Sequence, residues 1–173
     1  MTYTIIHILK SFVFFTILLA SFFFFSTQST HAYFTTNQSA IVLSNHTVLF
    51  LIDYSFGTNK YEVTLPVRAQ NSTVKQNDTV SFSILDKDNK TVAGKTTSIV
   101  LSKATLNAQK MYTVPKKVGE KFTLAVFFTP EPYELEKEYR LQVTHLPFMF
   151  DGAQQLQLNP SELTYYTTKL ISL

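Results

Sequence analysis

Residues 121–129 read KFTLAVFFT, and their apolar side chains occupy every second position. Successive side chains of a β-strand point to opposite faces of a sheet, so this spacing predicts a strand with one face in a core. The predicted core face consists of Phe122, Leu124, Val126 and Phe128. Because an amphipathic helix needs apolar residues three or four positions apart, the segment favours a β-protein.

The same period of two recurs on both sides of this segment. Alternating apolar residues predict half-buried strands at residues 61–68, 79–85 and 140–144. Residues 47–56 are apolar on both faces, which is typical of a central strand. Shorter strands are expected at residues 39–43, 98–101, 154–158 and 165–170. Polar stretches that favour turns separate these strands at residues 69–78, 86–90 and 116–120.

The number and spacing of these strands predict the fold class. About seven to nine short strands, separated by roughly 10–15 residues, are typical of an all-β fold, and we expect an antiparallel immunoglobulin-like β-sandwich. A closed β-barrel is the alternative. The best candidate for a helix in this part of the chain is the segment EPYELEKE, residues 131–138, and Pro132 limits it to a short turn.

The N-terminus has the three-part layout of a secretion signal, which we assign to residues 1–32. The polar start carries one cation, Lys10, and an apolar run without charge follows at residues 11–26. Ala32 ends a short polar stretch with the small residues that signal peptidases require. We therefore expect a signal helix that is cleaved between Ala32 and Tyr33.

The alternative to cleavage is an uncleaved membrane anchor formed by residues 12–25. In both cases residues 33–173 form one β-sandwich domain of ordinary size on the outer side of the membrane. The cation Lys10 marks the inner side, because no further Lys or Arg occurs before Lys60. The expected location is therefore periplasmic, secreted or on the cell surface, with membrane contact only through the N-terminal segment if it is uncleaved.

The composition excludes several classes of exported protein. The chain contains no cysteine, so a disulfide scaffold and a lipid-modified cysteine are both excluded. Without Lys10, 14 basic residues stand against 12 acidic ones, which is a net charge of +2. This charge is too small and too dispersed for an electrostatic nucleic-acid binder.

Two internal segments resemble a known class of domain. Residues 80–96, VSFSILDKDNKTVAGKT, resemble a hairpin of bacterial immunoglobulin-like and fibronectin-like surface domains, in which an apolar strand ends in an Asp/Asn turn. Residues 114–128, VPKKVGEKFTLAVFF, resemble a strand–turn–strand of the same domains. Residues 31–43, 144–148 and 158–166 are similar to small exported proteins of uncultured bacteria. These resemblances imply an exported sandwich and no particular activity.

One turn carries the candidate metal ligands. Asp86, Asp88 and Asn89 place side-chain oxygens at a spacing that calcium tolerates. The segment lacks the later glycine and the bidentate glutamate of a helix–loop–helix calcium site. We therefore interpret it as a hairpin turn, with a weak calcium site as the alternative, and expect no cofactor.

Other catalytic or metal sites find little support. In residues 33–173 the only histidines are His46 and His145, and there is no G-x-S-x-G motif. His145, Met149 and Met111 are weak candidates for a soft-metal site, and we favour structural roles for them. A further cluster consists of Glu131, Glu134, Glu136 and Glu138. It lies in one polar stretch with Lys137, which favours a solvated loop over a catalytic carboxylate pair.

The aromatic residues suggest a surface for binding. Tyr165 and Tyr166 are adjacent, so in an edge strand one of them would face outward and serve as a binding surface for a protein or glycan. We therefore expect a non-catalytic binding or structural module with an unknown protein or glycan partner of the cell envelope. The alternatives are a periplasmic carrier or assembly factor with a free edge strand or groove, and a hydrolase of cell wall or glycan.

Overall fold

The computed structural model describes residues 36–135, 137–150 and 154–173. Contacts divide the chain into two units, Met1–Thr30 and His31–Leu173, and the described residues all belong to the second. The predicted signal or anchor, with its cleavage site at Ala32 and Tyr33, therefore lies outside the described residues. Within the described ranges, no helix combines the length and apolar character needed to cross a membrane.

The described residues form mostly β-strands, which confirms the all-β prediction. The strands are β1 (Thr36–Ser44), β2 (Thr47–Gly57), β3 (Val63–Leu65), β4 (Arg68–Asn71), β5 (Thr79–Leu85), β6 (Gly94–Ser102), β7 (Thr105–Leu106), β8 (Tyr112–Val114), β9 (Gly119–Pro130), β10 (Glu138–His145), β11 (Pro147–Phe150), β12 (Gln154–Gln157) and β13 (Ile171–Ser172). Two short helices, η1 (Pro132–Glu134) and α2 (Pro160–Leu163), lie in connections. This division yields more strands than the seven to nine expected, because several are only two to four residues long.

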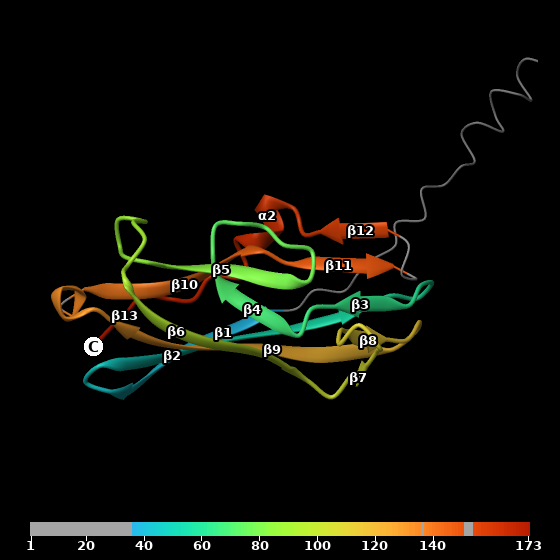
Figure 1. Cartoon of the computed structure of the whole chain (residues 1–173), viewed down its shortest axis with the longest axis horizontal. Coiled ribbons are helices and arrows are strands. Elements are labelled where there is room, and N and C mark those ends of the chain that lie inside the picture. Colours follow the sequence, from blue (N-terminus) through green and yellow to red (C-terminus); the bar gives the residue numbers. More distant parts are fainter. Residues whose placement is uncertain (1–35, 136, 151–153) are drawn as a thin grey trace, which may run out of the picture. The chain divides into compact units, whose positions relative to one another are not determined.

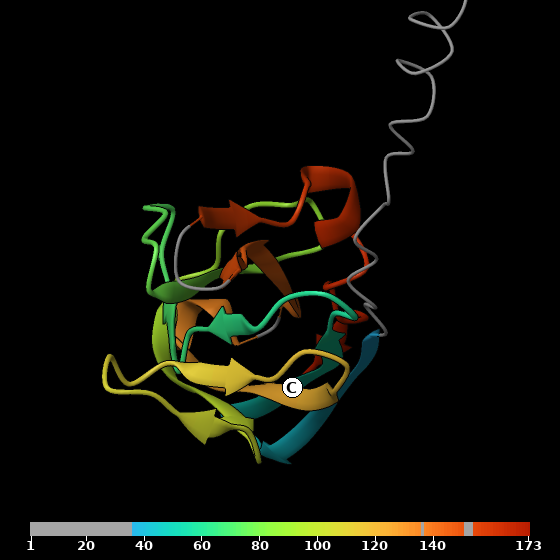
Figure 2. The same ribbon diagram turned by 90° about the vertical axis from the view of Figure 1, so that its right-hand side faces the viewer.

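The strands belong to three sheets that give a sandwich-like arrangement. Their orders are β1-β2-β9-β6, β13-β10-β5-β4 and β12-β11-β3-β8-β7. Figure 1 shows β1, β2, β6 and β9 in one layer and β5 with β10 in another, and Figure 2 shows the same domain from its end. All neighbouring strands are antiparallel except β4 and β5, which pair in parallel.

The core lies between the faces that the alternation predicted. The four side chains of β9 on the predicted core face are at most 1% exposed: Phe122, Leu124, Val126 and Phe128. Aromatic contacts join different sheets across this core. The rings of Phe128 on β9 and Tyr139 on β10 are 5.4 Å apart in an edge-to-face arrangement. The rings of Phe56 on β2 and Phe148 on β11 are 4.9 Å apart.

The strand expected at residues 61–68 is interrupted in the structure. β3 ends at Leu65 and β4 begins at Arg68, and Pro66 lies between them. Proline has no backbone N–H to donate to a ladder, so it separates the two pairings. The chain then enters a different sheet, and part of the stretch expected to be a polar connection becomes the edge strand β4.

The C-terminal segment also departs from the prediction. Residues 165–170 were expected to form an edge strand, but they meet the edge of β10 only at a single bridge between Gln142 and Thr167 with two flanking hydrogen bonds. The regular pairing at this edge is with β13, at the register Tyr139↔Ile171. The helix α2 comes first, because Asn159 and Pro160 provide a favourable helix start. The backbone N–H of Asn159 donates to the Glu162 carboxylate over 2.8 Å, which stabilises this start.

Candidate functional site

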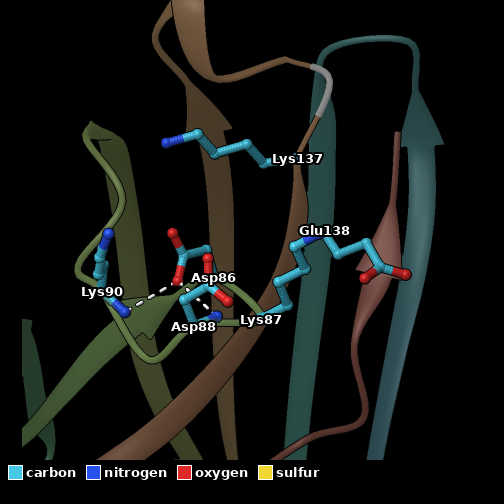
Figure 3. A pocket seen from close by; sticks show the side chains of 6 residues that line it. All are labelled: Asp86, Lys87, Asp88, Lys90, Lys137 and Glu138. Carbon is cyan, nitrogen blue, oxygen red and sulfur yellow. Dashed lines mark hydrogen bonds between the residues drawn. The ribbon is translucent and has the colours of Figure 1, made fainter.

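The turn at residues 86–90 connects β5 in one sheet to β6 in another. Its geometry depends on Asp86, whose Oδ1 accepts the backbone N–H groups of Asp88 and Lys90 at 2.9 and 2.8 Å (Figure 3). These hydrogen bonds, led by that from Lys90, hold the pKa of the Asp86 carboxyl below its usual value. Asn89 takes a left-handed conformation with φ 63°, as expected for Asn in a tight turn.

This turn engages the oxygens of the calcium candidates in internal contacts. Asp86 Oδ1 already accepts two N–H groups, and Asn89 Oδ1 accepts a hydrogen bond from the Arg140 guanidinium. Asp88 contributes its backbone N–H. Within the part of the chain that the structure describes, no three His, Cys, Asp or Glu side chains gather where they would hold a metal ion. The geometry thus accounts for Asp86 and Asn89 as turn-forming residues.

A shallow pocket of about 410 Å³ lies beside this turn. Its lining residues are Asp86, Lys87, Asp88, Lys90, Lys137 and Glu138 (Figure 3). Three cations and three anions balance, and the lining holds no histidine, hydroxyl or thiol that would act as a nucleophile or base near neutral pH. This pocket therefore offers charged groups of both signs for polar contacts.

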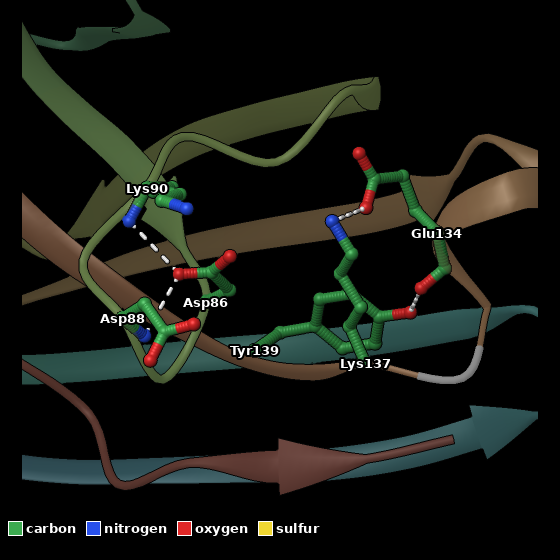
Figure 4. A network of polar contacts seen from close by, with 6 residues as sticks. All are labelled: Asp86, Asp88, Lys90, Glu134, Lys137 and Tyr139. Carbon is green, nitrogen blue, oxygen red and sulfur yellow. Dashed lines mark hydrogen bonds and ion pairs between the residues drawn. The ribbon is translucent and has the colours of Figure 1, made fainter.

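The acidic cluster after β9 stabilises a loop and does not assemble a carboxylate pair. Lys137 Nζ and Glu134 Oε2 are 2.5 Å apart (Figure 4), and this pairing is the main cause that raises the pKa of Lys137. Tyr139 donates its hydroxyl to the backbone carbonyl of Glu134. The Glu134 side chain is thus paired with a cation, whereas a glycosidase needs two carboxylates facing one bond. Glu136 lies outside the described residues.

The candidates for a soft-metal site lie on three different strands or connections. His145 ends β10 opposite Ser81, Met149 lies on β11 opposite Thr64, and Met111 precedes β8. His145 is only 5% exposed, and neither of its ring nitrogens has a hydrogen-bond partner of good geometry. Burial is the main cause that lowers the pKa of His145.

A second shallow pocket, of about 450 Å³, touches this histidine. Its lining residues are Asn77, His145, Leu156 and Gln157. The imidazole nitrogens themselves are covered, because each has almost no contact with solvent. A molecule in the pocket would therefore meet the amide side chains and not these nitrogens.

The two adjacent tyrosines lie in the turn that follows α2. Tyr165 is 67% exposed and Tyr166 is 1% exposed. The Tyr166 ring packs 5.8 Å from that of Tyr54, and burial raises the pKa of both phenols. Gln38 on β1 donates its side-chain amide to the Tyr165 backbone carbonyl, which holds the backbone of this turn beside the edge of the first sheet. The turn, and not the alternation of an edge strand, separates the two side chains.

A further apolar surface lies on the side of β9 that faces away from the core. In β9 the core side chains alternate with Ala125 and Phe127, so these two point away from the core. The register places Leu49 and Leu51 of β2 beside Phe127 and Ala125. We call this surface the outer face, and its apolar members are Ile41, Leu49, Leu51, Ile99, Leu101, Ala125 and Phe127.

Four members of the outer face are open to solvent, whereas Leu49 and Leu51 are half-buried and Ala125 is buried. Ile41, Ile99, Leu101 and Phe127 are 44, 46, 49 and 43% exposed. Charged residues occur towards its margins, with Lys95 at one end of the strands and Asp53 and Lys121 at the other. The sequence indicated part of this surface, because residues 47–56 carry apolar side chains on both faces of the predicted strand. The contribution of Ile99 and Phe127 depends on strand pairing.

The edge of this sheet is a second exposed feature. β1 pairs only with β2, and its residues Ile41, Val42 and Leu43 are 44, 45 and 50% exposed. The strand contains neither lysine nor proline, residues that commonly protect an edge. An irregular register between Val42 and Ser44 interrupts the edge at its C-terminal end.

Comparison with known proteins yields no family model, no curated protein and no solved structure that matches this chain.

Proposed function

We propose that this protein is an exported, immunoglobulin-like β-sandwich that acts as a non-catalytic binding or structural module of the cell envelope or exterior. The observation that carries the proposal is the outer face of the β1-β2-β9-β6 sheet. Four of its apolar side chains are more than two-fifths exposed and lie in one continuous register. Contiguous apolar surface of a few hundred Å² on a soluble domain is typical of an interaction site.

One contact supports the immunoglobulin-like type of sandwich. In such domains a tyrosine near the start of a strand donates its hydroxyl to the backbone a few residues upstream, in the arrangement called the tyrosine corner. Tyr139 stands at the second position of β10 and donates to the Glu134 carbonyl, five residues earlier. Its ring is fully buried and packs against Phe128 of the other layer.

The polar groups of the described residues favour binding over catalysis. The carboxylates examined as candidates serve a turn, through Asp86, or an ion pair, through Glu134. The histidine that is buried, His145, has ring nitrogens that no pocket exposes. Export is supported by the N-terminal layout of residues 1–32. A protein or glycan of the envelope is therefore the partner class that we propose.

A second function has one observation in its favour. An assembly factor or carrier binds a partner strand along a free sheet edge, and β1 offers such an edge with Ile41, Val42 and Leu43 exposed. The register shift beside Ser44 shortens the usable edge. We therefore rank edge binding second to binding through the outer face.

The proposal is tested with the exported full-length chain. We expect the wild-type protein to sediment with washed envelope fragments and Phe127→Ser to remain in the supernatant. The matched control is Leu106→Ser, because Leu106 is 52% exposed on β7, outside the outer face. Equal sedimentation of the two variants would contradict the proposal, as would hydrolysis of purified wall glycan by the wild-type protein.

A further inference from the structure

The outer face carries a projection and a recess on the same strand. Phe127 is 43% exposed, whereas Ala125, two residues earlier and on the same side of β9, is 6% exposed. Residues two positions apart on a strand are separated by about 7 Å. A twofold axis in the plane of contact, perpendicular to β9 and midway between these two residues, would place Phe127 of each copy over Ala125 of the other.

The neighbouring strands fit the same axis. Leu49 pairs with Phe127 and Leu51 with Ala125, so Leu49 of one copy would lie over Leu51 of the other. On β6, Thr97 pairs with Phe127 and Ile99 with Ala125. Thr97 of one copy would therefore lie over Ile99 of the other. Two sheets packed in this way keep their strands within about 30° of each other at a separation of about 10 Å.

The charged side chains lie at the margins of the face and do not oppose one another under this operation. Lys95 lies in the row of Thr129 at one margin, and Asp53 lies in the row of Thr123 at the other. The axis exchanges the two rows and stacks each strand on its own copy, so Lys95 on β6 lies over Leu101 of the partner and Asp53 on β2 lies over Thr47. No charged side chain belongs to the apolar block between them.

The area of the face suits a weak, specific dimer. A free Phe side chain offers roughly 200 Å², so Phe127 at 43% exposure leaves on the order of 80 Å² in water. The apolar members together then offer roughly 400 Å², which is typical of an interaction patch. Two such faces with their polar margins would bury about 1,200 Å² in total, the lower limit for stable interfaces.

We propose that two copies of this chain associate through their outer faces about this twofold axis. The inference rests on the proposed function, because it names the partner of the same surface. Closed twofold dimers are the commonest soluble oligomers, and they require a surface that is complementary to itself. The alternation of Phe127 with Ala125 provides that property.

Sedimentation velocity on residues 31–173 tests the proposal, because contacts group these residues into one compact unit. Over about 1–500 µM protein, we expect a reversible dimer with a Kd in the micromolar range. Phe127→Ser should raise Kd by roughly 30-fold or more, as expected for a central aromatic anchor. Ala125→Phe should also weaken association, because it fills the recess. Leu106→Ser should leave Kd unchanged.

The decisive variant is the exchange Ala125→Phe with Phe127→Ala. The axis passes between positions 125 and 127. In the double variant the projecting Phe at position 125 of one copy again lies over the small Ala at position 127 of the other, so the exchange should recover most of the association lost in Ala125→Phe. Circular dichroism and thermal unfolding check that each variant is folded.

Three outcomes would overturn the dimer. The first is a wild-type protein that stays monomeric over the whole range, and the second is a double exchange that is weaker than both single variants. The third is a monomer whose outer face binds vesicles of phosphatidylcholine and phosphatidylglycerol and loses this binding in Phe127→Ser. A monomer that still sediments with envelope fragments through Phe127 would refute the dimer and leave the proposed function standing.

Discussion

Replacing Tyr139 by Phe tests the contact that joins the two layers at the start of β10. The change removes the hydroxyl that donates to the Glu134 carbonyl and keeps the ring that packs 5.4 Å from Phe128. The carbonyl still accepts the Lys137 backbone N–H at 3.1 Å, so it is not left without a partner. We therefore expect the cost of one net hydrogen bond, about 1 kcal/mol in the free energy of unfolding.

The assay is urea unfolding near neutral pH, where an ordinary phenol keeps its proton, and burial raises the pKa of Tyr139 further. A loss of about 1 kcal/mol corresponds to a fall of roughly 3–5 °C in Tm for a domain of this size. Tyr139→Ala also leaves a cavity and should cost about 3–5 kcal/mol. Tyr133→Phe is the control, because Tyr133 is 74% exposed. If Tyr139→Phe were as stable as this control, the hydrogen bond would contribute nothing and the reasoning would fail.

Three further variants test other parts of the structure by urea unfolding. His145→Phe should make the free energy of unfolding depend less on pH below about 6.5. The pKa of His145 is lowered in the folded wild type, so the wild type should lose up to about 1.4 kcal/mol of stability per pH unit as the pH falls below that value. Equal pH profiles of the two proteins would contradict this. Gly94→Ala places a Cβ 2.4 Å from Phe128 Cε2 and should cost about 1–3 kcal/mol, whereas Gly119→Ala, with nothing within 4 Å, should cost far less; equal losses would refute the packing argument. Asp86→Asn keeps the acceptor of the turn and should unfold at a higher urea concentration than Asp86→Ala. At a pH above the ordinary carboxyl pKa, the wild type with ionised Asp86 should be more stable than both variants, and it should lose that advantage as acid protonates Asp86. Identical urea midpoints for the two variants would show that the acceptor is unimportant.

The alternation of apolar residues was sufficient to predict the strands that face the core. Phe122, Leu124 and Val126 are buried because each points to the same side of β9, and the period of two records this directly. Local sequence also carried the turn at Asp86, because short polar side chains hydrogen-bond to the backbone that follows them.

The pairing of strands could not be predicted from such local patterns. The turn after Leu85 closes a short hairpin as expected, with an antiparallel bridge between Leu85 and Thr91, but the chain then leaves β5, and β6 belongs to a different sheet. The parallel pairing of β4 with β5, two consecutive strands, was likewise not visible in the alternation of either segment. A period of two in the apolar residues shows which side of a strand is buried, but it does not show which other strand lies beside that strand.

The outer face, too, was predictable from local sequence only in part. Leu49 and Leu51 were recognisable as an apolar second face, but Phe127 and Ile99 join them only through the register of β9 with its two neighbours. The tyrosine pair at 165 and 166 depended instead on a turn, because α2 and not an edge strand precedes it. The burial of His145 depends on tertiary packing, which local sequence does not specify.

The most direct test of the central claim is the protection of the outer face in cells that export the full-length chain. The protein has no cysteine, so one introduced thiol is a unique site for a membrane-impermeant maleimide. Thr97→Cys lies on the exposed outer face, and Leu106→Cys lies on β7 away from it. We predict rapid labelling at position 106 and labelling at least about tenfold slower at position 97, as for a thiol in an occupied interface. Equal rates would contradict the outer face as the binding surface, and no labelling at position 106 would contradict export.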